Sequence, residues 1–355
     1  MKKRKILFLG ETYRADAITW INGLKQFGDF EIISWELKTR SHGGINRFFR
    51  LLEYCFAVFR IRSMVKAENP DMVIAERTTS YGFLAALSGV KPIAIAQQGV
   101  TDLWPETSVL LPIKKLIQNY AFKKSDLIHA WGDVMTDSMV KSKVDMRKVL
   151  VLPKGVDLSV FDNKNNTQIS EIRAIVTRSL ASEYRHDIIL KAFAVLHQKG
   201  YDFSLTIVGD GVQRSALESL AKTLGISQKV NFTGRIQSND LTVFLKGSNY
   251  YISMPITEGV SASLFEAMAT QCYPLVTDVP GNQSWIRHRK NGQLIAIDDF
   301  EMLASEMVWA IENPEYRSAV TANNRKFVEE KANYSINMKI IAEQYHSLIS
   351  TVKYN

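Results

Sequence analysis

The strongest constraint on the fold is an alternation of short apolar runs with longer amphipathic segments, which occurs twice along the 355 residues. In the first series, apolar runs at residues 6–10, 31–35, 72–75 and 92–97 are separated by helical patterns such as residues 15–27. Strands that alternate with helices in this way form parallel sheets covered on both faces. The first series therefore predicts a doubly wound α/β domain.

The alternation begins again after residue 160. The polar, Asn-rich stretch at residues 162–167 has no apolar anchor and is typical of a linker. Apolar runs at residues 173–177, 203–208 and 250–254 then alternate with helical patterns, and residues 315–352 are helical in pattern throughout. We therefore expect two Rossmann-like domains, whose ligands bind beyond the carboxyl ends of the strands.

These patterns predict an α/β chain with a cleft between its two domains. The expected N-terminal domain spans residues 1–160 and the expected C-terminal domain spans residues 161–335. Residues 336–355 are expected to form a final helical segment.

The positive charge of the chain is confined to its first part. Residues 1–150 contain 23 Lys and Arg against 15 Asp and Glu, whereas the remainder contains 21 of each. This asymmetry favours an anionic partner, either a nucleic acid, an anionic membrane or a phosphorylated substrate; a solvated basic face is the alternative. The amphipathic segment at residues 47–66 fits peripheral contact with an anionic membrane, and it equally fits packing on the sheet.

Composition excludes several other classes. No run of 18 apolar residues predicts a membrane span, and the apolar run after the basic start at residues 2–5 is too short for a secretory signal. The two cysteines, Cys55 and Cys272, are far apart, and no Cys/His spacing indicates a metal site. We expect a cytoplasmic protein, with the inner face of the plasma membrane as the alternative location.

A candidate binding segment follows the apolar run at residues 250–254. The loop at residues 257–262 leads into a helix expected to begin near Ser263, and free backbone N–H groups at a helix N-terminus bind phosphate. Glu258 in the loop and Glu266 in the expected first helical turn are suited to the hydroxyls of a sugar or ribose. Alternatively, Ser263 and Glu266 form a capping box and Glu258 is a solvated loop residue.

This segment resembles the nucleotide-sugar site of the family 4 retaining glycosyltransferases, which have the two-domain GT-B architecture. The matching residues are Glu258-Gly259, Glu266-Ala267-Met268-Ala269 and Asp278-Val279-Pro280-Gly281-Asn282. Residues 152–157, 208–211 and 232–234 resemble further segments of the family in the same order. The resemblance also implies that the final helix, at residues 336–355, packs back on the N-terminal domain. The resemblance extends over most of the chain and is clearest in its C-terminal half.

The resemblance implies roles for individual residues. Glu258 would hold hydroxyls of the transferred sugar, Glu266 would bind the ribose of the donor, and Arg178 would bind its phosphates, with Glu258 and Arg178 as the catalytic pair. The other donor-binding residues that it implies are Gly259, Val260, Ser261, Ala262, Gly209, Gly211, Gly234, Arg185 and Gly10.

The sequence departs from the family in three places. Tyr184 stands where a phosphate-binding lysine is usual, so Tyr184 or Arg185 would replace it. A common histidine is absent after the run at residues 92–97, which makes Gln98 and Asp102 acceptor-site candidates. The usual paired glycines near the N-terminus are reduced to Gly10, followed by Glu11, a third acceptor-site candidate.

The implied activity is retaining transfer of a sugar from a UDP- or GDP-sugar, without a metal or other cofactor, to a hydroxyl of a glycan or lipid-linked glycan. Such a reaction would serve the assembly of surface polysaccharide or glycolipid. The alternatives are a nucleotide-sugar epimerase and a catalytically silent nucleotide-sugar binder on the same scaffold. A nucleic-acid-binding protein is not favoured, because no nucleic-acid-binding motif is present.

Overall fold

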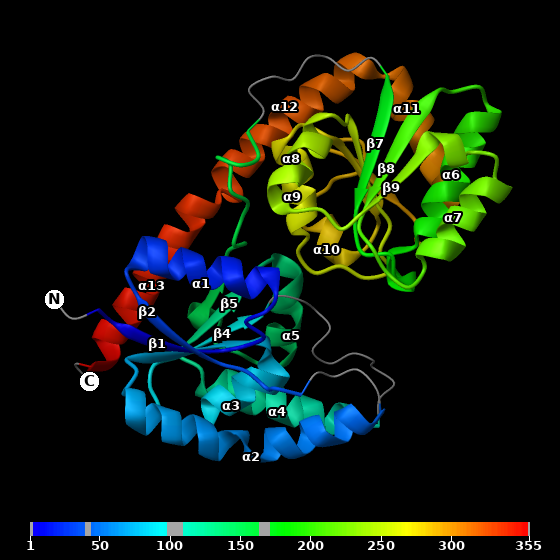
Figure 1. Ribbon diagram of the computed structural model, residues 1–355. Coiled ribbons are helices and arrows are strands. Elements are labelled where there is room, and N and C mark those ends of the chain that lie inside the picture. Colours follow the sequence, from blue (N-terminus) through cyan, green and yellow to red (C-terminus); the bar gives the residue numbers. More distant parts are fainter. Residues whose placement is uncertain (1–2, 40–43, 98–108, 163–170, 354–355) are drawn as a thin grey trace. The chain divides into compact units, whose positions relative to one another are not determined.

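The computed structural model describes residues 3–39, 44–97, 109–162 and 171–353. The chain forms two compact units (Figure 1). Unit 1 comprises Met1–Lys154 together with Ser335–Asn355, and unit 2 comprises Gly155–Tyr334. Each unit contains a six-stranded parallel sheet, so the expectation of two Rossmann-like α/β domains is confirmed. The units divide a few residues before the boundaries expected at residues 160 and 335.

The sheet of unit 1 has the strand order β2-β1-β3-β4-β5-β6. Its strands are β1 (Lys5–Leu9), β2 (Glu31–Trp35), β3 (Met72–Glu76), β4 (Ile93–Gln97), β5 (Leu127–Ala130) and β6 (Val149–Val151). Strands β3 and β4 are buried along their whole length, as expected for a sheet with helices on both faces.

Helices cover both faces of this sheet (Figure 1). They are α1 (Ala15–Gly28), α2 (Gly44–Glu68), α3 (Phe83–Ala86), α4 (Leu111–Lys124), α5 (Thr136–Lys141) and α13 (Tyr334–Lys353). Buried residues of α2, α3 and α4 share one core with Leu7, Val73 and Ile95 of the sheet. The C-terminal helix α13 belongs to unit 1, and Arg4 beside β1 donates hydrogen bonds to the His346 carbonyl and to Ser350 Oγ (2.8 Å).

One helical segment of unit 1 departs from regular α-helical geometry. Residues Arg77–Gly82 form a π-helix, which is followed by the short α3. Gly82 permits this wider turn, because a Cβ there would lie 2.8 Å from the Arg77 carbonyl oxygen. Helices α4 and α5 were not predicted.

The sheet of unit 2 has the order β12-β11-β10-β7-β8-β9. Its strands are β7 (Ile172–Thr177), β8 (Phe203–Val208), β9 (Val230–Gly234), β10 (Tyr250–Ser253), β11 (Tyr273–Thr277) and β12 (Gln293–Ile295). Its helices are α6 (His186–Gln198), α7 (Arg214–Thr223), α8 (Ser238–Lys246), α9 (Ala262–Ala269), α10 (Pro280–Gln283), α11 (Phe300–Glu312) and α12 (Pro314–Lys331).

The continuous helical pattern over residues 315–352 is interrupted, contrary to expectation. Helix α12 ends at Lys331 and α13 begins at Tyr334. Between them, Val156 donates its N–H to the Ala332 carbonyl (2.8 Å) and accepts the Tyr334 N–H (3.0 Å). Because this pairing engages the backbone of the connecting residues, they belong to neither helix. The chain passes from unit 2 back to unit 1 at this point.

Both sheets contain a point at which the strand order reverses. In unit 1 the chain runs outward from β1 to β2 and then returns to β3 on the other side of β1. In unit 2 it runs outward from β7 through β8 to β9 and returns to β10 on the other side of β7. In open parallel sheets, ligands bind beyond the carboxyl ends of the strands at such a switch point. The fold therefore directs the search for sites to the residues after β1 and β3 and after β7 and β10.

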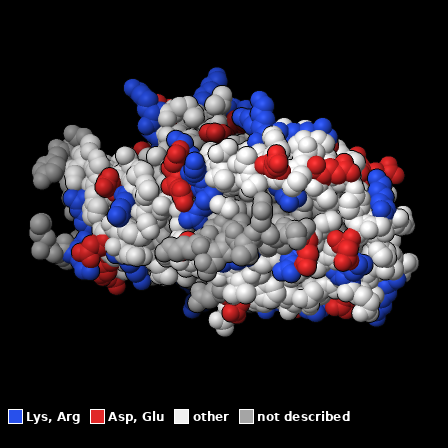
Figure 2. All heavy atoms as spheres, turned by 90° about the horizontal axis from the view of Figure 1, so that it is seen from above, with Lys and Arg blue, Asp and Glu red and all other residues white. Residues whose placement is uncertain are grey.

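The charged surface is mixed on the face in Figure 2, where lysine and arginine side chains are interspersed with aspartate and glutamate side chains. Among the described residues, no helix combines the length and hydropathy required to cross a bilayer.

Candidate functional site

An arginine and a glutamate meet at the switch point of unit 2. Arg178 follows β7, and Glu258 lies in the loop that connects β10 to α9. Their side chains form an ion pair, and both are largely buried, with exposed fractions of 15% and 13%. The Arg178 guanidinium also donates hydrogen bonds to Ser261 Oγ (2.5 Å) and to Ser253 Oγ (3.3 Å). Arg178 thus joins the ends of two neighbouring strands to the start of α9.

Helix α9 begins at Ala262 and is capped by Ser261. The Ser261 backbone is extended, and its Oγ accepts the N–H of Leu264 (3.2 Å). Ser263 is already inside the helix, so the capping box expected for Ser263 and Glu266 is not formed. Glu266 consequently lies in the second helical turn rather than in the first, where its side chain is half-buried.

Three glycines allow the backbone to close tightly around this pair. A Cβ at Gly209 would lie 2.1 Å from the Arg178 carbonyl oxygen, and one at Gly211 would lie 2.4 Å from the Leu180 carbonyl oxygen. A Cβ at Gly281 would lie 2.1 Å from the Glu258 carbonyl oxygen. Any larger residue at these positions would displace backbone, which explains the glycines without reference to a ligand.

The predicted donor residues around the glycines are placed as follows. The Gly209 N–H bonds to the carbonyl of Gly234 (2.9 Å), which has a positive φ of 75°. The N–H of Gly259 bonds to the side chain of its neighbour Glu258 (3.1 Å). Val260 is half-buried against the core that includes Phe265, and Ala262 is exposed.

Tyr184 and Arg185, the two residues that could replace the phosphate-binding lysine usual in the family, occupy different environments. The Tyr184 ring lies beside Arg178, whose Cζ is 5.5 Å from the ring centroid, a distance typical of a cation–π contact. Arg185 has a left-handed backbone and forms ion pairs with Asp187 (3.2 Å) and Asp298. Tyr184 is therefore part of the Arg178 environment, whereas the Arg185 side chain is held by two carboxylates.

The electrostatics keep Arg178 cationic. Burial acts to lower the pKa of Arg178, but Tyr251, Glu258 and Tyr184 outweigh this effect and raise it above its ordinary value. The nearby His186 is fully buried, and burial lowers its pKa to about 4. The imidazole is therefore neutral near pH 7, and Arg178 supplies the positive charge.

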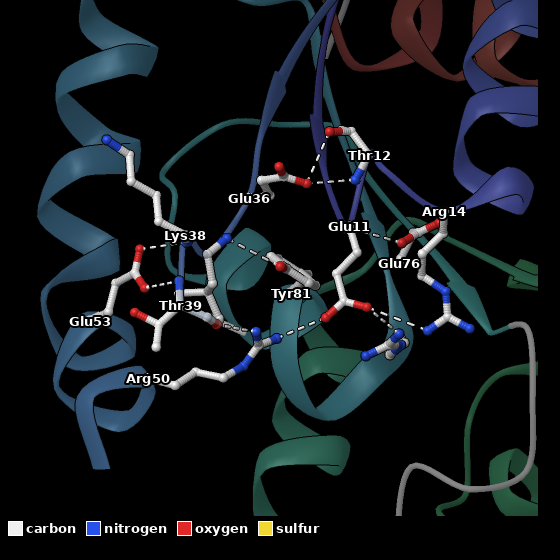
Figure 3. A network of polar contacts seen from close by, with 12 residues as sticks. Glu11, Thr12, Arg14, Glu36, Lys38, Thr39, Arg50, Glu53, Glu76 and Tyr81 are labelled. Atoms are coloured by element: carbon white, nitrogen blue, oxygen red, sulfur yellow. Dashed lines mark hydrogen bonds and ion pairs between the residues drawn. The ribbon is translucent and has the colours of Figure 1, made fainter. Parts of the chain in front are cut away.

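The switch point of unit 1 holds a second arginine–glutamate cluster (Figure 3). Glu11, directly beyond β1, accepts hydrogen bonds from Arg50 (2.9 Å), Arg77 (2.7 Å) and Arg14 (3.3 Å). Its side chain is 7% exposed. Burial acts to raise the pKa of Glu11, but Arg77, Arg50 and Arg14 hold it below its ordinary value. The carboxylate therefore organises three cations.

Gly10 lies next to this cluster and leaves room for a neighbouring carboxylate. A Cβ at Gly10 would lie 2.6 Å from Oε2 of the buried Glu76, and that same oxygen accepts the Glu11 N–H (3.1 Å). Gly10 thus leaves room for a carboxylate of its own unit. The other two acceptor-site candidates, Gln98 and Asp102, lie outside the described residues.

Several site residues were not predicted from the sequence. Ser253 and His186 lie beside Arg178, and Arg50 and Arg77 converge on Glu11. Ser253 and Arg77 could have been found, because each stands at or just beyond the carboxyl end of a predicted strand. Arg50 could not, because it is one of five basic residues on α2 and only the packing selects it.

Comparisons with known proteins agree with this architecture. Residues 160–327 match the family model for glycosyl transferases group 1, and residues 5–131 match the model for glycosyl transferase 4-like proteins. An uncharacterized glycosyltransferase of Haemophilus influenzae is 32% identical over 51% of this chain and 50% of its own length. A putative glycosyltransferase of Bacillus subtilis, EpsD, is 28% identical over 39% of this chain and 36% of its own length. The matches thus span about half or less of these curated relatives.

A longer match joins this chain to a named enzyme of Campylobacter jejuni, N-acetylgalactosamine-N,N'-diacetylbacillosaminyl-diphospho-undecaprenol 4-alpha-N-acetylgalactosaminyltransferase. It is 20% identical over 77% of this chain and 76% of its own length.

Solved structures share the fold over almost the whole chain. HepE from Anabaena, in complex with UDP, has a TM-score of 0.80 at 15% identity and covers 98% of this chain and 100% of its own. Sucrose-phosphate synthase from Thermosynechococcus elongatus has a TM-score of 0.80 at 13% identity, with coverages of 98% and 100%. With a group 1 module in unit 2, a 4-like module in unit 1 and the GT-B fold throughout, the chain belongs to the GT4-type glycosyltransferases.

Proposed function

We propose that this protein transfers a sugar from a UDP- or GDP-sugar to a hydroxyl of a glycan or lipid-linked glycan, with retention at the anomeric carbon and without a metal. The observation that carries the proposal is the Arg178–Glu258–Ser261 cluster at the switch point of unit 2. It combines a buried cation, a carboxylate and a capped helix N-terminus, which are the groups that a sugar diphosphate requires.

The donor would be held by groups of different kinds. The N–H groups at the start of α9 and the Arg178 guanidinium would bind the diphosphate. Glu258 would accept hydrogen bonds from the transferred sugar, and Glu266 would accept them from the ribose. Two solved structures of the relative HepE support a nucleotide-sugar donor, because one contains UDP and the other contains UDP-glucose.

Catalysis would depend on stabilising the diphosphate as it leaves. Arg178 is fixed by hydrogen bonds to two serines and stays charged, so it can meet the developing negative charge without reorganising. The acceptor oxygen would attack on the face from which the diphosphate departs, forming the new C–O bond as the C–O bond to phosphate breaks. The acceptor proton would pass to the leaving phosphate oxygen, so no protein nucleophile is needed.

We place the acceptor on unit 1, at the cluster around Glu11. Arg14 and Arg77 keep exposed fractions of 47% and 31% while bound to Glu11, so they present donors to an approaching ligand. Glu11 would then position these arginines. The Campylobacter jejuni relative is named for a diphospho-undecaprenol acceptor, which supports a lipid-linked glycan, and we include peripheral contact of residues 47–66 with an anionic membrane in the proposal.

A thermal-shift screen against UDP, GDP and their sugars tests the donor assignment. A nucleotide that binds the native state raises the melting temperature by mass action. Arg178→Lys should weaken binding of the active nucleotide about 10- to 100-fold, because a lysine loses charge-assisted hydrogen bonds worth about 1.5–3 kcal/mol each. Arg289→Lys, at a separate ion pair with Glu306 (2.8 Å), is the matched control.

Two outcomes would count against the proposal. If no nucleotide raises the melting temperature, or if Arg178→Lys and Arg289→Lys behave alike, the donor site is misassigned. If UDP or GDP binds but no sugar is transferred to lipid-linked or soluble glycans, the silent-binder alternative is favoured. Release of an epimerised nucleotide sugar would favour the epimerase alternative.

A further inference from the structure

A lysine is almost completely buried at the carboxyl edge of the sheet in unit 1. Lys154 follows β6, and its side chain is 8% exposed. Its Nζ lies over the ring of Trp131, which directly follows β5, at 5.2 Å from the ring centroid. A lysine is rarely buried to this extent without a partner of opposite charge. The position of that partner therefore bears on what the buried ammonium does.

The partner of Lys154 is a carboxylate that remains open to solvent. Lys154 Nζ donates a hydrogen bond to Asp16 Oδ1 (3.0 Å), and the Asp16 side chain is 47% exposed. Asp16 lies in the first turn of α1, which follows β1, so it lies at the same edge of the sheet as Glu11. From the described part of the chain, Asp16 Oδ2 receives no hydrogen bond. An ionised carboxylate can accept about four hydrogen bonds, so Asp16 keeps the capacity to bind a ligand.

The burial of Lys154 distinguishes this ion pair from an ordinary surface pair. In the pair of Lys3 and Asp29, at the other end of α1, both side chains are exposed, with fractions of 59% and 75%. Such exposed pairs contribute little to stability, whereas the burial of an ammonium is costly. Here the buried ammonium fixes one oxygen of an exposed carboxylate. A group held in place by a buried partner is typical of a binding site.

Charge also distinguishes Asp16 from the neighbouring Glu11 cluster. Glu11 is surrounded by three arginines, and the resulting excess of positive charge suits an anion. The charge of Asp16 is balanced by Lys154, so neither an anion nor a cation is favoured at this position. A neutral ligand with several hydroxyls fits best, because each hydroxyl can donate a hydrogen bond to the carboxylate. Hydrogen bonds to a charged acceptor are stronger than those between neutral groups.

We propose that Asp16 binds hydroxyls of the acceptor's sugar and that Lys154 positions the Asp16 carboxylate. The arginines around Glu11 would meet the charged part of the acceptor, and Asp16 would meet its neutral sugar. Lys154 is a positioning residue, because it acts through Asp16. The inference rests on the proposed function, since it concerns the acceptor of the same transfer. It does not depend on the donor chemistry, because Asp16 and Arg178 belong to different units.

Saturation-transfer NMR tests this sugar site, because the method detects weak ligands of a large protein. The probes are the methyl glycosides of glucose, galactose and N-acetylglucosamine, each added to the full chain in the presence of UDP or GDP. The control ligand is 2-methoxytetrahydropyran, which has the same six-membered ring without hydroxyls. We expect at least one glycoside to give a signal and the control ligand to give none.

Variants of the ion pair locate the bound sugar. Asp16→Asn should weaken binding of the active glycoside about 10-fold or more, because a neutral amide replaces a charged acceptor. Asp29→Asn is the matched control, since Asp29 pairs with Lys3 at the other end of α1. Lys154→Met should weaken binding several-fold, and Lys154→Arg should retain most of it, because the arginine keeps a cation beside Asp16. Asp16→Glu keeps the charge but moves the carboxylate, so it should also weaken binding, and it replaces Asp16→Asn if that variant does not fold.

Four results would overturn the proposal. They are the absence of a signal from every glycoside, equal binding by the Asp16 and Asp29 variants, equal binding by the two Lys154 variants, and loss of the signal in Glu258→Gln but not in Asp16→Asn. The last result would place the sugar in the donor site of unit 2.

The rise in melting temperature with UDP or GDP, measured for each variant, verifies that the variant is folded. It also separates the two proposals. A rise without any glycoside signal contradicts only the sugar site at Asp16, whereas no rise with any nucleotide contradicts the proposed function.

Discussion

At the scale of single residues, each switch point pairs a glutamate with arginine, but the balance of charge differs. In unit 2, one arginine meets Glu258, and serine hydroxyls complete its environment. In unit 1, three arginines meet Glu11. A carboxylate surrounded in this way holds like charges together, and its removal leaves them unneutralised.

Glu11→Gln should therefore destabilise unit 1 by about 3 kcal/mol, because it leaves three guanidinium groups beside a neutral amide. Glu36→Gln is the control, since the donors to Glu36 among the described residues are neutral, namely the N–H and Oγ–H of Thr12 (2.7 and 2.9 Å). Urea unfolding of the two variants at pH 7 measures the difference. Equal losses would mean that the convergence of arginines on Glu11 has no special energetic role.

The pH dependence of this effect has a definite sign. The folded pKa of Glu11 lies below its ordinary value, so its ionised form contributes stability at neutral pH. That contribution is present above the unfolded pKa near 4.5 and is lost as the pH falls through the lower, folded pKa. The gap in stability between wild type and Glu11→Gln should accordingly narrow below about pH 4.5.

At the scale of elements, the beginning of α9 determines which residues can serve a ligand. Because Ser261 is the cap, its hydroxyl both satisfies the Leu264 N–H and accepts a hydrogen bond from Arg178. The start of the helix and the position of the guanidinium are thereby coupled. Glu266 lies one turn further along, in the second turn of the helix.

Ser261→Ala should cost about 1 kcal/mol of stability through the lost cap and should weaken nucleotide binding as well. Ser263→Ala, inside the helix, should change stability by less than about 0.5 kcal/mol. Asp299→Ala is a reference for cap loss alone, since Asp299 caps α11 by accepting the Met302 N–H (2.7 Å). Thermal melts with and without UDP measure both effects. A larger loss of stability in Ser263→Ala than in Ser261→Ala would instead support the capping box of Ser263 and Glu266.

At the scale of the whole molecule, each unit contains a buried neutral histidine. His129 in β5 of unit 1 is 1% exposed and hydrogen-bonds through Nε2 to the Leu152 carbonyl (2.7 Å). His186 is the counterpart in unit 2. Burial lowers the pKa of each imidazole to about 4 from an ordinary value of 6.5. Acid therefore lowers the stability of both units through the same effect, the protonation of a buried histidine when the unit unfolds.

The protein should lose stability steadily between pH 6.5 and pH 4. In this range the unfolded chain binds protons at these histidines and the folded chain does not, so the unfolding free energy falls as the pH falls. The loss approaches about 3 kcal/mol for each histidine. Calorimetry at several pH values measures it. His129→Gln should flatten the response of unit 1 only; an unchanged slope would show that other groups dominate acid unfolding.

The sequence by itself determined the fold class and located the loop and helix that carry Glu258 and Glu266. Apolar runs at strand spacing predict parallel strands because their burial depends on local pattern, and most strands lie within one or two residues of the expected positions. As expected, Glu258 lies in the glycine-containing loop before α9, and Glu266 lies within that helix. These features depend on residues that are close together in the chain, so they can be predicted from the sequence.

Tertiary structure decided which distant groups meet. Only strand order brings Arg178 to Glu258 and Arg77 to Glu11, because neighbours across a switch point are far apart in the chain. Only backbone conformation makes Ser261, rather than Ser263, the cap of α9. Only packing decides that Ala57 of α2 is buried while Phe56 beside it is exposed, since α2 is apolar on both sides and its sequence alone does not tell which side faces the sheet.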